Sequence, residues 1–450
     1  MSGFSIDKQT LDDLNLAGRF RKGAVIGLFD RTRTRQGRMR LEAMFRNPLT
    51  DAQAINARSA VFRYFHEARV EFPFGDELTD AAEFYIGASG ARSRMSAAAG
   101  ILAGKVRSMF VPDGSFAKLQ EGMSALLRII GHTAALLKRL PAEGSPIRER
   151  SQRFFAAFGD AALERIAAAA DRPDMPLWEM VRLDGWLRAD CGSAVADMMD
   201  LIYDMDLCIS VASAAAELRL TYAEAQPAEA HLFEIKGVRH ISLADAVPND
   251  ITIDDSRNLY FLTGINMAGK STFMKAVSIA TYLAHAGFPV AAESMRFSPI
   301  DGICTSINVP DNIEMGYSHF YAEVLRVKHI AELVGQGKRL LVVFDELFKG
   351  TNVKDAFDAT LAVTAAFASH AGCRFIVSTH IVEVGEALAQ RCANVQFHYF
   401  PTGFDGSKLL YPYRLEEGIS HDRHGMTIIR NEGILDIIAG CGDRSEQKPE

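Results

Sequence analysis

The stretch that decides the fold of this chain reads Gly264-Ile265-Asn266-Met267-Ala268-Gly269-Lys270-Ser271-Thr272. It fits G-x-x-x-x-G-K-[ST], the pattern of the phosphate-binding loop of NTPases. An apolar run, Leu259–Leu262, precedes it, and a segment of helical character, Phe273–Ala284, follows it. Because this loop works between a strand and a helix, the flanking segments favour a nucleotide site over a chance match.

The residue types in this stretch suit phosphate chemistry. Glycines let the backbone curl so that successive N–H groups point at phosphate oxygens. The N-terminus of the following helix adds a partial positive charge. We therefore expect residues 264–272 to hold the phosphates, with Lys270 reaching the β- and γ-phosphates and Ser271 ligating Mg²⁺.

A second apolar run, Leu340–Phe344, ends in two acids, Asp345 and Glu346. Hydrolysis of a phosphoanhydride needs a carboxylate near Mg²⁺ and a group that positions or deprotonates the attacking water. Asp345 suits the first role and Glu346 the second. Taken alone, the pair equally describes a buried strand followed by surface acids, but downstream of a phosphate loop it favours catalysis.

Two further positions belong to this hypothesis. His380 follows the apolar run Phe375–Val377 and can sense a γ-phosphate through a hydrogen bond. Ser318 precedes a helical segment and can present its hydroxyl to a phosphate. Each has a simpler interpretation, since a lone strand-end histidine or a serine helix cap is common.

The bulk properties restrict the class of protein. The 450 residues suffice for two or three domains, and 48% hydrophobic with 23% charged residues is an ordinary globular composition. The net charge of −7 excludes a global basic field for nucleic acid. A local basic stretch, Arg19–Arg46, either contacts DNA or forms a solvated, salt-bridged helix face.

The cysteines and apolar runs predict a cytoplasmic location without a membrane anchor. Six cysteines lie singly, which argues against a structural zinc site or a disulfide framework and fits a reducing compartment. Residues 1–14 are polar and do not resemble a signal peptide. No apolar run approaches the length that spans a bilayer.

Periodicity divides the chain near Pro227. The first half has helical spacing, including a capping-box pattern at Thr50–Gln53 and an alanine-rich region, Ser151–Ala225, interrupted at Pro173 and Pro176. Beyond Pro227, strand-like and helical runs alternate, which predicts an α/β sheet with the nucleotide at the C-terminal ends of its strands. We expect domains at 1–226 and 227–440, and a disordered tail at 441–450.

In this order, the motifs resemble those of the MutS family of DNA mismatch-repair ATPases, within the ABC ATPase superfamily. The family's phosphate loop is typically G-P-N-M-G-G-K-S-T, and here Ile265 and Ala268 replace a proline and a glycine. Three other segments resemble its G-x-S-T-F-x-x-E, D-E-x-x-x-G-T-[ST] and T-H motifs: Gly316–Glu323, with His319 for threonine, Asp345–Asn352, and Thr379-His380.

The resemblance extends upstream. Residues 28–34, 37–41 and 47–49 look like the start of the family's lever domain, and residues 205–216 look like the segment that joins the levers to the ATPase. Pro248–Asp250 resembles the stretch before the first ATPase strand. Val247 stands where the family often has an aromatic residue that stacks on adenine.

The resemblance implies an α + α/β fold, in which an N-terminal all-helical lever domain precedes an ABC-type P-loop α/β ATPase domain. It implies ATP and Mg²⁺ as cofactors and a homodimer in which Ser318 of one subunit reaches the nucleotide of the other. Since the sequence starts at the lever, we expect no mismatch-recognition or connector domain. The family recognises mismatches with a Phe-x-Glu motif. Phe65-His66-Glu67 matches this motif, but we interpret Phe65 as part of a helix core.

Two functional hypotheses remain open at this point. The first is a DNA-repair or recombination ATPase that engages DNA through paired levers. The second is a regulatory ATPase that acts mainly on a protein partner, such as a repair protein, with little direct DNA binding. A metabolic NTPase is a distant third, because nothing in the first half resembles a substrate pocket.

Overall fold

The computed structural model describes residues 3–16, 23–87, 115–170, 172, 175–307, 319–405, 408–420, 429, 433–435 and 437–438. The chain divides into two compact units. One unit comprises residues 1–25, 47–56 and 220–450, and the other comprises residues 26–46 and 57–219. We call them the sheet unit and the helical unit and describe each by itself.

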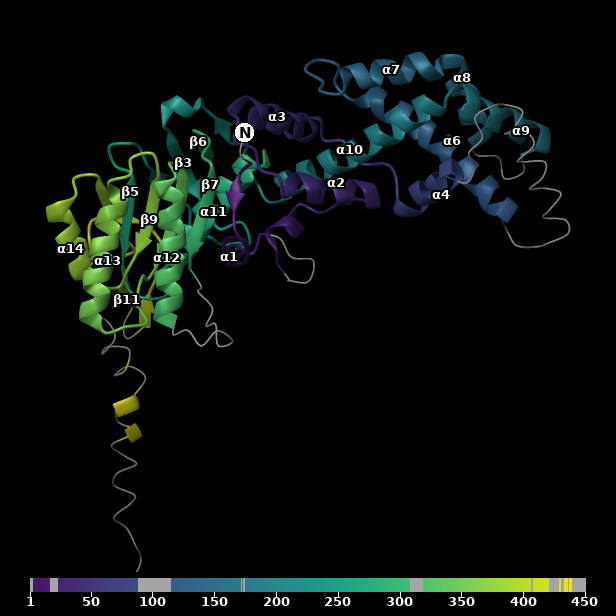
Figure 1. Ribbon diagram of the computed structural model, residues 1–450. Coiled ribbons are helices and arrows are strands. Elements are labelled where there is room, and N and C mark those ends of the chain that lie inside the picture. Colours follow the sequence, from purple (N-terminus) through teal and green to yellow (C-terminus); the bar gives the residue numbers. More distant parts are fainter. Residues whose placement is uncertain are drawn as a thin grey trace, which may run out of the picture. The chain divides into compact units, whose positions relative to one another are not determined.

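The sheet unit is built on a seven-stranded sheet in the order β1-β7-β8-β9-β5-β10-β13 (Figure 1). Its strands are β1 (Ser5–Ile6), β7 (Gly302–Ser306), β8 (Leu340–Asp345), β9 (Arg374–Ser378), β5 (Leu259–Thr263), β10 (Val395–Tyr399) and β13 (Glu416–Glu417). All neighbours are parallel except β10 and β13. Each of the three strands that the sequence predicted is present within one residue of its expected bounds at either end.

Helices cover both faces of this sheet, which explains why its central strands read as continuous apolar runs. One face packs against α12 (His319–Gly335), α13 (Val353–Ala368) and α14 (Val382–Arg391), whose apolar side chains share a core with Phe261 of β5 and Phe344 of β8. Tyr260 points to the opposite face, where its ring meets Phe273 of α11 (Lys270–His285). The predicted helix 273–284 is therefore confirmed and begins three residues earlier.

A smaller sheet flanks α11. It has the order β2-β6-β3-β4, with β2 at Glu224–Ala225, β6 at Ser294–Phe297, β3 at Phe233–Val238 and β4 at Asn249–Thr252. Helix α11 contacts β3 as well as β8 and β9, so nearly all of its residues are buried. The unit also contains the helical turn Ala228–Ala230 and the hairpin of β11 (Gly403–Asp405) and β12 (Lys408–Leu410).

The start of the chain completes the edge of the main sheet. Strand β1 pairs with β7, and a Cβ at Gly302 would collide with the Ser5 carbonyl, so this close approach requires glycine. Helix α1 (Lys8–Asp13) follows, and the buried Asp13 carboxylate accepts hydrogen bonds from Thr305 Oγ1 at 2.7 Å and from the Ile307 amide at 3.1 Å. The helical interpretation of the first half missed β1 and β2, because both are too short to leave a periodic pattern.

A second buried contact ties the same segment to α12. The Arg326 guanidinium forms an ion pair with Asp7 and donates to the Thr305 carbonyl. Burial raises the pKa of Asp7, but the hydrogen bonds from Arg326 and from the Thr10 amide outweigh it and hold the pKa below its ordinary value. Residues 3–16 therefore pack as an integral part of the sheet unit.

His285, at the end of α11, is a buried histidine that the fold keeps neutral. Its Nε2 accepts a hydrogen bond from the Ile300 amide at 3.0 Å, so Nδ1 carries the proton and donates to the Thr281 carbonyl at 2.8 Å. Burial lowers the pKa of His285 from an ordinary 6.5 to about 4. Protonation would place a second proton on Nε2, opposite an amide that already donates.

We expect this histidine to make stability fall in mild acid. Below pH 6.5 the unfolded state binds a proton at His285, whereas the folded state binds it only near pH 4. The free energy of unfolding therefore decreases as the pH falls from about 6.5 to about 4. Between about pH 7.5 and about pH 5 the loss attributable to His285 is about 2 kcal/mol. Urea unfolding of wild type and His285→Gln across this range measures it, because other titrating groups cancel in the comparison. An identical pH slope in both proteins would contradict the assignment.

The helical unit consists of long packed helices, as the first-half periodicity predicts. They are α2 (Arg35–Phe45), α3 (Ala52–Ala68, which begins in the sheet unit), α4 (Asp76–Gly87), α6 (Ser115–Arg139), α7 (Arg148–Phe158), α8 (Asp160–Ala170), α9 (Leu177–Gly185) and α10 (Gly192–Glu217). A 3₁₀ turn at Val25–Leu28 precedes them, and a π-helical turn at Trp186–Asp190 joins α9 to α10. The burial of Phe65 in α3 confirms its interpretation as helix core.

Two local details differ from or refine the sequence interpretation. The cap of α3 is Asp51 rather than Thr50, since the Asp51 carboxylate accepts from the Ala54 amide at 2.7 Å. Thr34 is the N-cap of α2, and its hydroxyl oxygen accepts a hydrogen bond from the Gly37 amide. The amide and hydroxyl of Thr34 in turn donate hydrogen bonds to the buried carboxylate of Asp206 in α10. A Cβ on Gly37 would collide with Asp206, so these residues form one packed joint.

Three of the six arginines that the structure describes in the basic stretch 19–46 form ion pairs with acids. Arg31 pairs with Glu217 at 2.5 Å, Arg38 pairs with Asp30 at 3.0 Å, and Arg40 pairs with the two acids Asp200 and Asp204. These three arginines fit the interpretation of a salt-bridged helix face. Arg19, Arg21 and Lys22 lie outside the described residues, as does the predicted tail 441–450.

Candidate functional site

Residues 264–269, the candidate phosphate loop, connect the C-terminal end of β5 to the first turn of α11. Three of these residues have positive φ angles: Gly264 at 129°, Met267 at 70° and Gly269 at 112°. Gly269 caps α11 in a left-handed conformation that glycine adopts without strain. The loop therefore curls ahead of a helix N-terminus, which is an arrangement suited to an anion.

Lys270 lies buried at the start of α11 with its ammonium folded back onto this loop. Its Nζ donates to the Gly264 carbonyl at 2.7 Å and to the Ile265 carbonyl at 3.1 Å. Burial lowers the pKa of Lys270, whereas the charges of Glu346 and Asp345 raise it. These carbonyl bonds keep the ammonium paired at the mouth of the loop.

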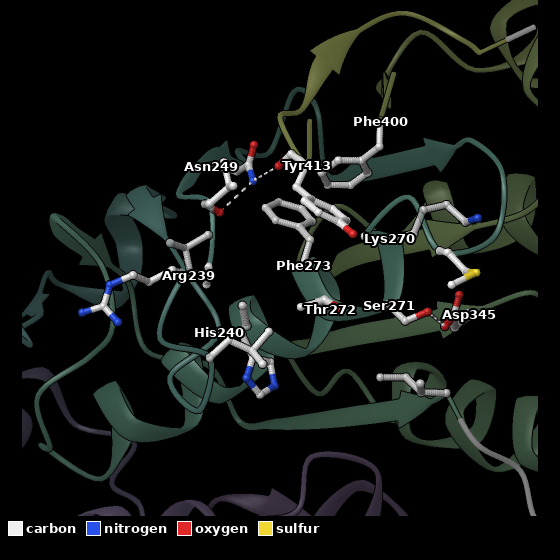
Figure 2. Close-up of a pocket in the computed structure, with 18 of the residues that line it drawn as sticks. Arg239, His240, Asn249, Lys270, Ser271, Thr272, Phe273, Asp345, Phe400 and Tyr413 are labelled. Carbon is white, nitrogen blue, oxygen red and sulfur yellow. Dashed lines mark hydrogen bonds between the residues drawn. The ribbon is translucent and has the colours of Figure 1, made fainter. Parts of the chain in front are cut away.

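Asp345 stands at the end of β8 between two serine hydroxyls. Ser271 Oγ donates to Asp345 Oδ2 at 2.5 Å, and Ser378 Oγ, at the end of β9, donates to Asp345 Oδ1. Figure 2 shows the Ser271 and Asp345 side chains pointing toward one another. A hydroxyl and a carboxylate side by side fit Mg²⁺, which takes oxygen ligands and binds proteins through one or two carboxylates plus phosphates and water.

The described residues contain no group of three or more His, Cys, Asp or Glu side chains that could hold a metal by themselves. A Mg²⁺ ion at Ser271 and Asp345 therefore requires ligands from a phosphate and water. This requirement agrees with a site that binds the metal together with a nucleotide.

Glu346 and His380 lie next to each other at the same edge of the sheet. His380 Nδ1 is 3.9 Å from Glu346 Oε1. Glu346 has a φ of 55°, and its amide donates to the Ser378 carbonyl at 3.0 Å. Backbone strain of this kind costs on the order of 1–3 kcal/mol and concentrates at functional sites. Glu346 also lines the cavity beside the candidate phosphate loop.

A cavity of about 830 Å³ opens beside these residues, within the size range of small-molecule sites. Among the residues that line it are Asn266, Met267, Gly269, Lys270, Ser271, Thr272, Asp345, Glu346 and Val247. Gly264, Ile265 and Ala268 are not among the lining residues, and two of them serve as carbonyl partners of Lys270. Ser318 lies outside the described residues.

Another part of the cavity wall consists of residues that sequence reasoning missed as site residues: Arg239, His240, Phe273, Phe400 and Tyr413 (Figure 2). Asn249 holds this wall together by donating to the carbonyls of Val247 at 3.2 Å and Tyr413 at 3.0 Å. Burial, and secondarily the charge of Lys275, lowers the pKa of His240 and favours a neutral imidazole. Only the Pro248–Asp250 stretch carried a sequence signal for this wall.

Comparison with known families agrees with this geometry. Residues 260–444, which include the loop, both acids and His380, match the family model described as MutS domain V. Over these residues the chain belongs to the MutS family. No helix in the described part of the chain is long and apolar enough to cross a membrane.

Several curated relatives are similar to part of the chain. The DNA mismatch repair protein MutS of Fusobacterium nucleatum subsp. nucleatum is 29% identical over 236 residues, which are 51% of this chain and 26% of that protein. The DNA mismatch repair protein MSH3 of Saccharomyces cerevisiae (strain YJM789) is 31% identical over 207 residues, 45% of this chain and 20% of that protein. The DNA mismatch repair protein MutS of Aquifex pyrophilus is 29% identical over 192 residues, which are 43% of this chain and 22% of that protein. The chain thus spans only between a fifth and about a quarter of the length of these relatives.

Proposed function

We propose that this protein is a MutS-type ATPase that binds ATP with Mg²⁺, hydrolyses it as a homodimer and couples the cycle to DNA engagement. The observation that carries the proposal is the meeting of Lys270, Ser271, Asp345 and Glu346 at one end of parallel strands, beside a cavity of nucleotide size. The curated relatives are named as DNA mismatch repair proteins, which supports a role in DNA repair.

In this proposal each residue has one task. The backbone of residues 264–272 cradles the phosphates, and the Lys270 ammonium leaves the loop carbonyls for the phosphate oxygens. Ser271 and Asp345 hold Mg²⁺, which when bound neutralises charge on the phosphates. Glu346 orients the attacking water and accepts its proton, and His380, beside it, senses the γ-phosphate.

The part of the cavity beside Tyr413 and Val247 then holds the base. The exposed ring of Tyr413 offers aromatic surface there, whereas Val247 offers only an aliphatic contact. An aromatic ring on one side and an apolar side chain on the other suit a flat purine. Tyr413 thereby supplies the aromatic surface that Val247 cannot.

The dimer and the lever are the remaining parts of the proposal. We place Ser318 of one subunit at the nucleotide of the second, so that each ATP bridges two chains. The proposed lever domain, residues 1–226, contains the helical unit, and residues 227–440 form the proposed ATPase domain.

The test measures ATP hydrolysis and nucleotide-dependent DNA binding by the purified protein at several salt concentrations. The proposal expects Mg²⁺-dependent hydrolysis, and DNA binding that weakens steeply with salt, since each phosphate contact adds about 0.9 to the slope of the logarithmic plot. Matched, mismatched and branched duplexes identify the preferred DNA. A protein that neither binds nor hydrolyses ATP contradicts the proposal.

One observation favours a second candidate, a regulatory ATPase that acts mainly on a protein partner. Arg31, Arg38 and Arg40 already pair with acids, and the net charge is −7, so half of the described arginines of the basic stretch are engaged within the protein. Under this alternative ATP hydrolysis persists, but DNA binding is weak and its salt response is flat.

A further inference from the structure

Ser378 is a buried residue at the end of β9 that contacts both catalytic acids of the proposed site. Strands β8 and β9 are parallel neighbours, and their register places Asp345 directly beside Ser378. The Ser378 side chain is fully buried, and its hydroxyl donates to Asp345 Oδ1. Its carbonyl accepts the Glu346 amide at 3.0 Å. One residue therefore holds one acid through its side chain and the other through its main chain.

The two oxygens of Asp345 have different partners. Oδ2 faces Ser271, the other proposed Mg²⁺ ligand, whereas Oδ1 faces Ser378, which lies on a strand of the sheet core. Ser271 sits on the exposed first turn of α11, next to the loop that must receive the phosphates. The hydrogen bond from Ser378 therefore fixes the Asp345 carboxylate to a strand of the sheet core.

We propose that Ser378 is a positioning residue that presets Asp345 for Mg²⁺ through its hydroxyl. This inference rests on the proposed function, because it concerns the same site. A carboxylate fixed by a hydrogen bond from a buried group needs no reorganisation when it takes up a cation, and outer-shell partners of this kind change metal affinity by about 10–100-fold when removed. The main-chain bond to Glu346 does not depend on the side chain, so substitution separates the two contacts.

The experiment compares Ser378→Ala with a matched control, Ser278→Ala. Ser278 is an equally buried serine of α11. Its hydroxyl donates to the Met274 carbonyl at 2.8 Å rather than to Asp345. Calorimetry with a non-hydrolysable ATP analogue measures nucleotide affinity in EDTA and across a Mg²⁺ titration. The Mg²⁺ concentration that gives half-maximal hydrolysis is a second readout.

We expect Ser378→Ala to raise the Mg²⁺ midpoint about tenfold or more in both readouts while leaving affinity in EDTA within about twofold. Ser278→Ala keeps the wild-type midpoint, and Ser378→Thr, which retains the hydroxyl, recovers most of it. If the alanine variant does not fold, Ser378→Cys, with a similar size and a weak donor, takes its place and is expected to raise the midpoint.

Two results overturn the inference in distinguishable ways. A folded Ser378 variant that lacks the hydroxyl and keeps the wild-type Mg²⁺ midpoint removes the positioning role and leaves the proposed function standing. A wild-type protein whose nucleotide affinity does not respond to Mg²⁺ overturns the proposed metal site and the role of Ser378 together.

Discussion

Lys270→Ala abolishes ATP hydrolysis and weakens ATP binding in the proposed enzyme. The ammonium is buried at the mouth of the loop, where its bonds to the Gly264 and Ile265 carbonyls hold it beside the proposed phosphate site. Truncation removes a preorganised positive charge from the transferred phosphoryl group. The loss of one such stabilising group costs about 3 kcal/mol or more of transition-state stabilisation, which is a rate decrease on the order of a hundredfold or greater.

Steady-state phosphate release and nucleotide titration measure this effect. Lys328→Ala is the matched control, because Lys328 is an exposed lysine of α12 and loses the same charge without touching the site. Circular dichroism verifies that both variants fold. Wild-type turnover by folded Lys270→Ala would show that these residues do not form the phosphate site.

Glu346→Gln separates nucleotide binding from chemistry. The amide keeps the shape of the side chain and its place beside His380, whose Nδ1 lies 3.9 Å from Oε1, but it cannot accept a proton. We expect ATP and Mg²⁺ to remain bound while hydrolysis slows by at least about 10²-fold, since a general base contributes roughly 10²–10⁴. Single-turnover hydrolysis with pre-bound ATP measures the chemical step directly.

Asp345→Asn is the informative comparison for this variant. It removes the same amount of charge one residue earlier, yet we expect it to weaken the Mg²⁺-dependence of nucleotide binding, because Asp345 faces Ser271. Opposite patterns in the two variants assign the metal role and the base role to different acids. Normal hydrolysis by Glu346→Gln means that another residue positions the water.

Local sequence predicted the parts of the fold that depend on short-range patterning. The runs at β5, β8 and β9 are apolar throughout, because both of their faces are buried, and this pattern was visible without a structure. Gly264, Gly269 and Lys270 lie within seven consecutive residues, so their proximity follows from sequence spacing alone. Placing Asp345 and Glu346 near that loop followed from expecting parallel strands with a common C-terminal edge.

Other parts of the site have no local signal. Tyr413 and Phe400 come from segments after β10, and His240 comes from a turn after β3, yet all three line one cavity. Val247 lines the cavity, and its role at the base stays a prediction. The Ser318 hypothesis also stays a prediction, since that residue lies outside the described part of the chain.

By itself, the sequence determined the alternation of strand, loop and helix around Lys270 and the identities of the two acids, because these depend on residue type and spacing along the chain. Only the tertiary structure decided strand order and register, which place Ser378 beside Asp345 and β1 beside β7. It also decided that residues 3–16 pack with the sheet unit, through Asp13 and the Asp7–Arg326 ion pair. The physical reason is that pairings between distant segments depend on complementary surfaces and buried hydrogen bonds, which no local pattern encodes.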